Sequence, residues 1–508
     1  MAKYQSGLIA RNIKLLKQKE WYNQRFDGCL NLIWMIAELH IKAEKRKLAG
    51  GNCTSHLCIF DGQKADWYMD LADIKRIASV FIRRAAIENH LGKKLMRQWS
   101  VDDKKLSAFF ARLDKVDLKK LSSQELRKLY SSLTDHYHKA ISYSSLIDGF
   151  ALGSDEIIQA EINKLLDQRG IVKGRGVIFS NLTASVHQSF INQAEISLFT
   201  IAERISKFKD MASALNNPAV KKLIAAHAAK YCWIKNNYFD RHILTPAYFI
   251  KELRSILKSS VNLQQEIRRI KDAPLINKKE KQALLKKLAP SRSLRNLLAI
   301  SEDFTYWQDE RKKRTMLFTH YALCFLEEIA RRFHIPPAAV KCLSQDEART
   351  ILAGGKIDRA ELTKRISHSF IYQKGEHYEI LSGHTAENVA QQIFEHQDQS
   401  HIQDFRGLTA STGRARGLAK IVTSVKEIDK VKVGDILVAV MTRPDYIMGI
   451  KKAAAIVTDE GGITCHAAII SRELGIPCII GTKIGTKILK DGDLIEVNAN
   501  HGWIRKIK

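Results

Sequence analysis

IVTDEGGITCHAAIISRELGIPCIIG, residues 456–481, is the stretch that decides the fold of the C-terminal part of the chain. A β-branched run at 456–458 predicts a strand that ends at an acidic pair and two consecutive glycines. Apolar residues then recur at helical spacing over 464–474, and a glycine and a proline end that pattern. A second strand is predicted at 478–480. The stretch therefore reads as strand, glycine turn, helix and strand, with His466 in the first helical turn.

The residues around this turn suit an anion site. Gly461 and Gly462 allow a sharp turn and a close approach of backbone to a ligand. Thr464 can cap the helix, whose first turn presents unpaired N–H groups and the positive end of the helix dipole. Neutral imidazole is a nucleophile near pH 7, since its ordinary pKa is about 6.5. A histidine met alone at such a place is better interpreted as a capping or core residue.

Arg472 is the basic residue of the predicted helix. It follows His466 by six residues, so it lies about 240° further round an ideal helix and on a different face. Its length allows it to reach a phosphate near the histidine. The alternatives are a contact with another domain or a pair with Glu473 or Asp459.

The histidine does not stand alone, because the whole motif G-G-x-T-x-H-A-A-I-I-x-R-E-L-G-I-P is present. It resembles the signature of the phosphohistidine swivelling (mobile) domain of the phosphoenolpyruvate-utilising enzymes. These include phosphoenolpyruvate synthase, pyruvate phosphate dikinase and rifampicin phosphotransferase. Residues 407–422, 434–444 (GDILVAVMTRP) and 491–497 resemble other strands and turns of that domain, so the likeness covers 405–508. One departure is Cys465, where serine is usual.

The resemblance implies that His466 is transiently phosphorylated and passes the phosphoryl group on, with Gly461, Gly462, Thr464 and Arg472 supporting the phosphate. In such enzymes the donor is ATP on an ATP-grasp domain or phosphoenolpyruvate on a C-terminal barrel. We recognise neither module here. We therefore expect an ATP-dependent phosphotransferase chain that depends on a separate ATP-grasp protein, which would carry ATP and Mg²⁺, and on an unidentified acceptor. This chain is expected to bind no metal or cofactor itself.

The rest of the chain has helical texture, and proline is absent before residue 218. We predict a multidomain protein with a large all-α N-terminal block and a C-terminal α/β domain of the β/β/α type. The predicted divisions are 1–355 for the helical block, which would hold the acceptor, 356–404 for a hairpin and helix connector, and 405–508 for the swivelling domain. Residues 52–67 are the exception within the block, since they are rich in turn and β formers.

Acceptor-site candidates in the helical block are polar groups that interrupt apolar helices. Each of them, taken alone, is better explained by packing or by surface exposure. They are His320, Tyr321, Trp307, Arg311, Trp233, Asn236, Asn237 and Tyr238.

The formal net charge is +28, which favours contact with polyanions. Residues 405–508 carry 17 Lys and Arg against 10 Asp and Glu, a net of +7, so the charge is not confined to one part of the chain. The densest basic run, 278–287 (KKEKQALLKK), suits a solvated helix face. The alternative function is a non-catalytic phospho-acceptor or regulatory protein whose basic helices bind nucleic acid or a protein partner. A concentrated basic stripe would be better evidence for nucleic acid.

The cysteines and the N-terminus bear on the compartment. Of the 8 cysteines only Cys53 and Cys58 lie close together, as C-x₄-C, and no second pair completes a zinc site. The N-terminus lacks the apolar core of a signal peptide, and the apolar stretch 30–39 is far too short to span a membrane. We expect a cytoplasmic protein without a membrane span.

Overall fold

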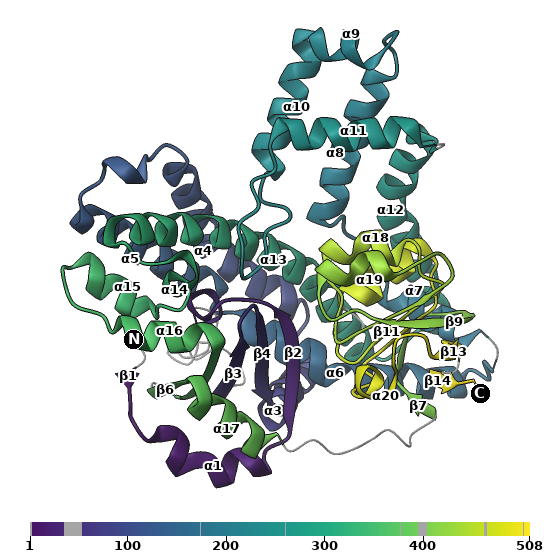
Figure 1. Cartoon of the computed structure of the whole chain (residues 1–508). Coiled ribbons are helices and arrows are strands. Elements are labelled where there is room, and N and C mark those ends of the chain that lie inside the picture. Colours follow the sequence, from purple (N-terminus) through teal and green to yellow (C-terminus); the bar gives the residue numbers. More distant parts are fainter. Residues whose placement is uncertain are drawn as a thin grey trace.

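A computed structural model describes residues 3–34, 53–172, 174–259, 261–375, 377–394, 404–461, 465–500 and 502–507. Figure 1 shows three parts: a block of long helices around a sheet, a helical arm that projects from the block, and a C-terminal domain with a sheet of its own. The C-terminal domain lies beneath the arm and beside the block, which puts its helix α19 next to both.

The sheet of the helical block has six strands in the order β1-β6-β5-β3-β4-β2. β3 and β4 form a hairpin, which confirms the β character predicted within 52–67. β5 and β6 form the hairpin predicted after the helical block, and β5 pairs antiparallel with β3. The strands are β1 (Lys3–Tyr4), β2 (Trp21–Asp27), β3 (Ser55–Asp61), β4 (Lys64–Asp70), β5 (His368–Lys374) and β6 (His377–Ser382).

The prediction of an all-α block over 1–355 is therefore wrong, because β2, β3 and β4 lie inside it. The physical reason is that β3 finds its second partner, β5, about 310 residues further along the chain. Periodicity in a short window cannot register such a pairing. The same pairing joins the predicted connector hairpin to the N-terminal strands in one sheet. The three domain boundaries themselves stay a prediction.

Helices cover both faces of this sheet. α1 (Leu8–Gln18) and α17 (Gly383–Ile393) pack on one face through a small apolar cluster. The other face joins a large core shared with α13, a single helix of 42 residues (Arg292–Phe333). The helices that share this core or continue from it are α3 (Leu71–Ile87), α4 (Leu91–Leu113), α5 (Ser123–Ile141), α6 (Ser144–Gln168), α7 (Arg175–Thr183), α14 (Pro337–Val340), α15 (Gln345–Leu352) and α16 (Arg359–Ser367).

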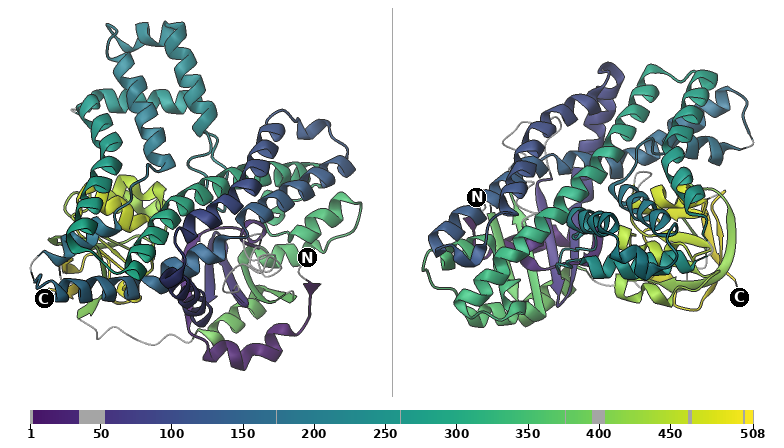
Figure 2. Two further views of the ribbon diagram at one scale, coloured as in Figure 1. Left: turned by 180° about the vertical axis from the view of Figure 1, so that it is seen from behind. Right: turned by 90° about the horizontal axis from the view of Figure 1, so that it is seen from above.

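The helical arm is formed by the chain between α7 and α13, and the left view in Figure 2 shows it standing away from the block. Two small apolar clusters hold it together. Its helices are α8 (Phe190–Ile205), α9 (Met211–Asn216), α10 (Pro218–Tyr231), α11 (Pro246–Lys258) and α12 (Leu263–Leu288).

The C-terminal domain contains an eight-stranded sheet in the order β7-β14-β13-β9-β10-β11-β12-β8. Its centre, β9-β10-β11-β12, is parallel, and the flanking strands are antiparallel. α19 covers one face and α20 the other, so the predicted α/β character is confirmed. The elements are β7 (Asp404–Arg406), β8 (Leu408–Ser411), β9 (Arg414–Ile421), β10 (Ile436–Ala439), α18 (Ile447–Ile450), β11 (Ala455–Thr458), α19 (His466–Leu474), β12 (Cys478–Ile480), α20 (Gly485–Ile488), β13 (Leu494–Asn498) and β14 (Trp503–Lys506).

Within the described ranges, no helix combines the length and the apolar composition that a bilayer crossing requires.

Candidate active site

His466 is the first residue of α19, as the pattern predicted. The chain leaves β11 and turns at Gly461, whose φ of +115° suits glycine. A Cβ at Gly461 would lie 2.7 Å from Sγ of Cys465, so the turn also requires a residue without a side chain at this position. The N-cap is Cys465, without a side-chain cap bond, and not the predicted Thr464. Thr464 and Gly462 lie outside the described residues.

The imidazole of His466 is held through one nitrogen. Nδ1 lies 2.9 Å from Oγ1 of Thr442, which is 4% exposed. Burial holds the pKa of His466 well below its ordinary value, and the positive charges of Lys312 and Arg443 lower it further. The ring is therefore neutral at pH 7. When Nδ1 carries the proton and donates it to Thr442, the lone pair on Nε2 is available as a nucleophile.

His466 faces a cavity of about 240 Å³ between the C-terminal domain and the helical block. Helix α13 supplies one wall, the edge strand β2 contributes to it, and the start of α8 closes the side below the arm. The C-terminal domain supplies its segment 441–447 and the first turns of α19. The polar and charged residues of this lining include Thr442, Arg443, Asp445, His466, Gln308, Asp309, Arg311 and Lys312.

Three cations line this cavity, and their surroundings differ. Arg311 donates to Asp148 at 2.8 Å, so its charge is balanced within the block. Burial lowers the pKa of Lys312 to about 8, although Asp445 acts in the opposite direction. Arg443 is 8% exposed, and its Nε and Nη2 have no hydrogen-bond partner among the described residues. A buried guanidinium with two unused donors is a binding group for an anion.

The C-terminal domain is held against the block and the arm in part by polar contacts. Lys451 pairs with Glu195 at 3.0 Å, and Asn192 donates to Glu473 at 3.1 Å. On another side, Lys64 of β4 donates to Thr423 at 2.8 Å. These contacts are hydrogen bonds and an ion pair, and Leu408 of β8 adds apolar packing against the core of the block.

Of the predicted phosphate-supporting residues, Gly461 forms the turn, and Arg472 lies elsewhere. The Arg472 guanidinium donates to the carbonyl of Ala410 at 2.7 Å and to that of Thr183 at 3.5 Å. The first bond ties α19 to β8, and the second reaches α7 in the block. Arg472 does not line the cavity, so the interdomain contact weighed from the sequence describes its position.

The acceptor candidates in the helical block divide into two groups. Arg311, Asn236, Asn237 and Tyr238 line the cavity. The other four do not belong to its lining: Trp307 packs at a tilt against Trp99, Tyr321 donates to Asp114, Trp233 packs on Phe190, and the His320 ring meets that of Tyr321 edge-on.

Sequence reasoning missed several groups that face His466. Thr442 and Arg443 belong to the T-x-P segment that carried part of the resemblance. The sequence therefore marked this segment as part of the domain, but it did not indicate a role for either residue. Lys312 and Asp309 lie in the charged half of α13, where many charges alternate. No local pattern distinguishes those two from their solvated neighbours.

Comparison with known proteins bears on the C-terminal domain above all. Residues 431–502 match the family model described as "PEP-utilising enzyme, mobile domain". A probable phosphoenolpyruvate synthase of Methanothermobacter thermautotrophicus is 34% identical over 212 residues, which are 39% of this chain and 30% of that protein. The phosphoenolpyruvate synthase of Pyrococcus furiosus is 55% identical over 101 residues, 20% of this chain and 12% of that protein. The matches thus span less than a third of these relatives.

Proposed function

This chain belongs, through its C-terminal domain, to the phosphoenolpyruvate-utilising enzyme family, and on that premise we propose that it is a phosphotransferase whose phosphoryl carrier is His466. The observation that carries the proposal is the position of the neutral imidazole. It stands at the N-terminus of α19 and faces a cavity that also contains Lys312 and Arg443, whose Nε and Nη2 find no hydrogen-bond partner in the described part of the chain.

The chemistry proceeds through Nε2. With Nδ1 protonated and bound to Thr442, the Nε2 lone pair attacks the phosphorus of the donor, an N–P bond forms, and the bond to the donor's leaving oxygen breaks. The negative oxygens of the transferred group meet the first N–H groups of α19 and the cations of Lys312 and Arg443. The resulting phosphohistidine is then the donor for the second transfer.

We propose ATP, accompanied by Mg²⁺, as the first donor, bound on a separate ATP-grasp protein. The proposal rests on the family resemblance. Phosphoenolpyruvate is the other donor that the family uses. The relatives are named phosphoenolpyruvate synthase, and this name fits a transfer that ends on phosphoenolpyruvate as well as the reverse transfer that starts from it. The carrier domain would move between the donor protein and the cavity described above. The polar contacts at its interface, such as Lys451 with Glu195, support such movement because each is weak.

The test is isotopic. The chain is incubated with its cognate ATP-grasp protein and, in separate reactions, with [β-³²P]ATP, [γ-³²P]ATP or [³²P]phosphoenolpyruvate. We expect an acid-labile, base-stable phosphate on His466 from the β-labelled nucleotide, and none in His466→Ala. The control is His384→Ala, whose side chain is 82% exposed and remote from the cavity. If only phosphoenolpyruvate transfers its label to His466, then phosphoenolpyruvate and not ATP is the donor. If none of the labelled compounds transfers its label, the carrier role is overturned.

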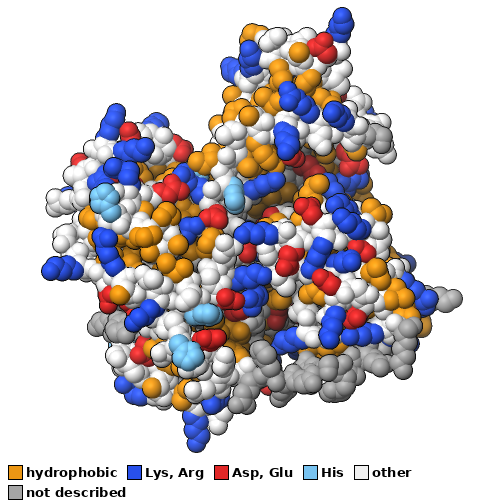
Figure 3. All heavy atoms as spheres, viewed as in Figure 1, with side chains coloured by type: hydrophobic (Ala, Val, Ile, Leu, Met, Phe, Trp, Pro, Cys, Tyr) orange, Lys and Arg blue, Asp and Glu red, His pale blue; other side chains and the backbone are white. Residues whose placement is uncertain are grey.

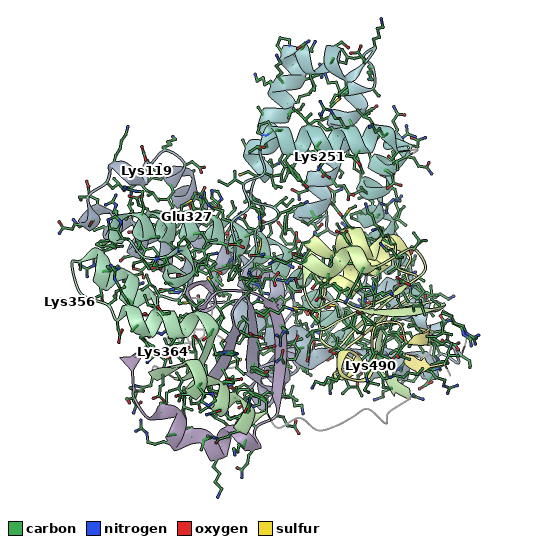
Figure 4. All side chains as sticks on the ribbon, in the orientation of Figure 1. Lys119, Lys251, Glu327, Lys356, Lys364 and Lys490 are labelled. Carbon is green, nitrogen blue, oxygen red and sulfur yellow. The ribbon has the colours of Figure 1, made fainter. Side chains whose placement is uncertain are left out.

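The alternative of a basic nucleic-acid-binding or partner-binding protein has less support. Figure 3 shows Lys and Arg side chains scattered over the visible face among Asp and Glu, without a single stripe. The lysines labelled in Figure 4 are exposed and lie in different parts of the structure: Lys119, Lys251, Lys356, Lys364 and Lys490. Binding to a polyanion should fall log-linearly with salt if this alternative holds. We expect no such binding at physiological ionic strength.

A further inference from the structure

Four buried polar atoms of the cavity lack a hydrogen-bond partner among the described residues. Two are donors, Nε and Nη2 of Arg443, and two are acceptors, Oε1 of Gln308 and Oδ1 of Asp445. A buried polar group without a partner destabilises the fold, so such atoms mark where a ligand completes the site. The Arg443 donors suit a phosphoryl group. The two acceptors need hydrogen-bond donors instead.

Most other polar groups of the lining are already engaged. Asn236 donates to the carbonyl of Met316 at 3.3 Å and accepts from the N–H of His242 at 2.8 Å. Tyr137 donates to Thr315 at 3.2 Å. The ligand's polar contacts therefore concentrate on Gln308 and Asp445. A carboxylate or a phosphate offers only acceptors, and it would leave both oxygens unsatisfied. A hydroxyl group can donate to either of them.

The charge and the shape of the walls agree with this chemistry. Arg311 is balanced by Asp148, and the remaining cations, Lys312 and Arg443, are those that act on His466. No further cation of the described lining is left for an anionic acceptor. Much of the rest of the wall is apolar, with aromatic rings and with isoleucine and methionine side chains; the rings are those of Phe26, Trp67, Tyr137, Phe190 and Tyr238. Such a wall favours an apolar or aromatic body on the ligand.

Resting on the proposed carrier role of His466, we propose that the cavity binds an uncharged compound with an aromatic or apolar body and that a hydroxyl group of this compound is the phosphoryl acceptor. Oε1 of Gln308 accepts a hydrogen bond from the compound and orients it. Asp309, the next residue on α13, takes the hydroxyl proton.

The position of Asp309 fits this role. Its carboxyl is fixed by the N–H of Phe190, which donates to Oδ2 at 2.9 Å, and it lines the cavity one helical turn before Lys312. Burial raises the pKa of Asp309 to about 7, although the bond from Phe190 opposes the rise. A carboxylate with that pKa is a better proton acceptor near neutral pH than an ordinary aspartate.

The transfer balances as follows. The hydroxyl oxygen attacks phosphorus and an O–P bond forms, while the N–P bond breaks and its electron pair returns to Nε2 of His466. The hydroxyl proton passes to the Asp309 carboxylate. Nδ1 keeps its proton and donates it in a hydrogen bond to Thr442 throughout. The products are therefore a phosphate monoester, neutral imidazole and a protonated Asp309.

The test uses the full chain phosphorylated chemically with phosphoramidate, which bypasses the protein donor. Benzyl alcohol, 2-phenylethanol and tyrosol are compared with benzoate, phenylacetate and 4-hydroxyphenylacetate, and the products are followed by ³¹P NMR. We expect at least one of the alcohols to discharge His466 about tenfold or more faster than water does and to yield its phosphate monoester. The carboxylates should not.

Two variants test whether the alcohol contacts Asp309 and Gln308 of α13. Asp309→Asn keeps an acceptor for the N–H of Phe190 and should slow transfer to the alcohol by about 100-fold per phosphorylated His466. Gln308→Ala should raise the alcohol concentration needed for half-maximal transfer. The matched control, Asp272→Asn on an exposed position of α12, should behave as the wild type.

The two proposals fail separately. If the carboxylates discharge His466 as fast as the alcohols, if every alcohol fails, or if Asp309→Asn transfers at the wild-type rate, the acceptor proposal is overturned and the carrier role stands. If His466 takes no phosphate from phosphoramidate or from any donor protein, the carrier role itself fails.

Discussion

Oγ1 of Thr442 lies 2.9 Å from Nδ1 of His466, although the two residues belong to different elements of the C-terminal domain. Thr442 follows β10, and His466 begins α19. Because β10 and β11 are parallel neighbours, their carboxyl ends meet at one edge of the sheet, and the hydroxyl meets the ring there. This bond selects which nitrogen of the imidazole is left to react.

Thr442→Val should therefore slow the phosphorylation of His466. The substitution keeps the volume and removes the hydroxyl, so the ring loses a bond worth about 1 kcal/mol and the fixed tautomer with it. We expect a rate lower by roughly five- to tenfold, measured as acid-labile phosphate formed per unit time. Thr442→Ser, which keeps the hydroxyl, should retain most of the rate. A wild-type rate in Thr442→Val would show that the bond has no part in the reaction.

The pH dependence should report on Lys312. Its pKa is lowered to about 8, so it is cationic below that pH and loses its charge above it. Loading of His466 should fall by about tenfold per pH unit above pH 8, as the charged fraction of Lys312 falls. Lys312→Arg, which stays charged, should remove this alkaline decline, and Lys312→Gln should be slow at every pH. An unchanged alkaline limb in Lys312→Arg would contradict the assignment.

The same lysine should influence the histidine. Lys312 is one of the two cations that lower the pKa of His466, so Lys312→Gln should raise it, which can be measured by NMR titration of the imidazole. The wild-type ring should stay neutral down to well below pH 6.5. Because the unfolded chain binds that proton more readily, the contribution of His466 to stability is lost as the pH falls below about 6.5.

Arg443→Met should separate activity from stability. The guanidinium is buried, and its Nε and Nη2 have no hydrogen-bond partner among the described residues, although the group also lies over the Tyr446 ring at 5.9 Å and interacts with Asp445. We expect loading of His466 to drop by about 100-fold and the melting temperature to fall much less than that loss of activity suggests. Arg416→Met removes an arginine whose side chain is 64% exposed on β9 and should leave loading unchanged. A large loss of stability in Arg443→Met would point to a structural role instead.

Docking of the C-terminal domain should weaken as pH rises through neutrality. Burial raises the pKa of Glu473 to about 7, while its bond from Asn192 and the charge of Arg269 act in the lowering direction and Glu195 in the raising direction. A carboxyl with a raised pKa stabilises the docked state below its ordinary pKa of about 4.3, and that contribution is lost as the pH approaches and passes 7. Crosslinking between the carrier domain and the arm should fall accordingly.

Glu473→Gln should remove this dependence, because the amide still accepts the bond from Asn192 and does not ionise. Its crosslinking yield should be the same at pH 5.5 and pH 8. Glu387→Gln on α17, a partly exposed site outside the interface, is the control and should keep the wild-type profile. Equal pH profiles for wild type and Glu473→Gln would rule out Glu473 as the titrating group.

Much of the C-terminal domain could be predicted because its signals are local. The β-branched run before Gly461 and the stop at Gly475, in the left-handed conformation at φ 67°, mark the ends of β11 and α19 within a few residues of sequence. The helical phase that buries Ala467 and Ala468 leaves the first turn at the edge of the sheet. His466 at a helix N-terminus follows from these short-range rules alone.

Only the tertiary structure decided what surrounds that histidine. Lys312 precedes His466 by 154 positions, and nothing in the sequence near either residue marks their meeting. The sheet of the helical block escaped prediction for the same reason, since β3 pairs with β5 across most of the chain. Local propensity and helix capping depend on residues that are neighbours in the sequence. The cavity exists because packing brings distant segments together, and the free energy of that packing belongs to the assembled chain rather than to any one stretch of it.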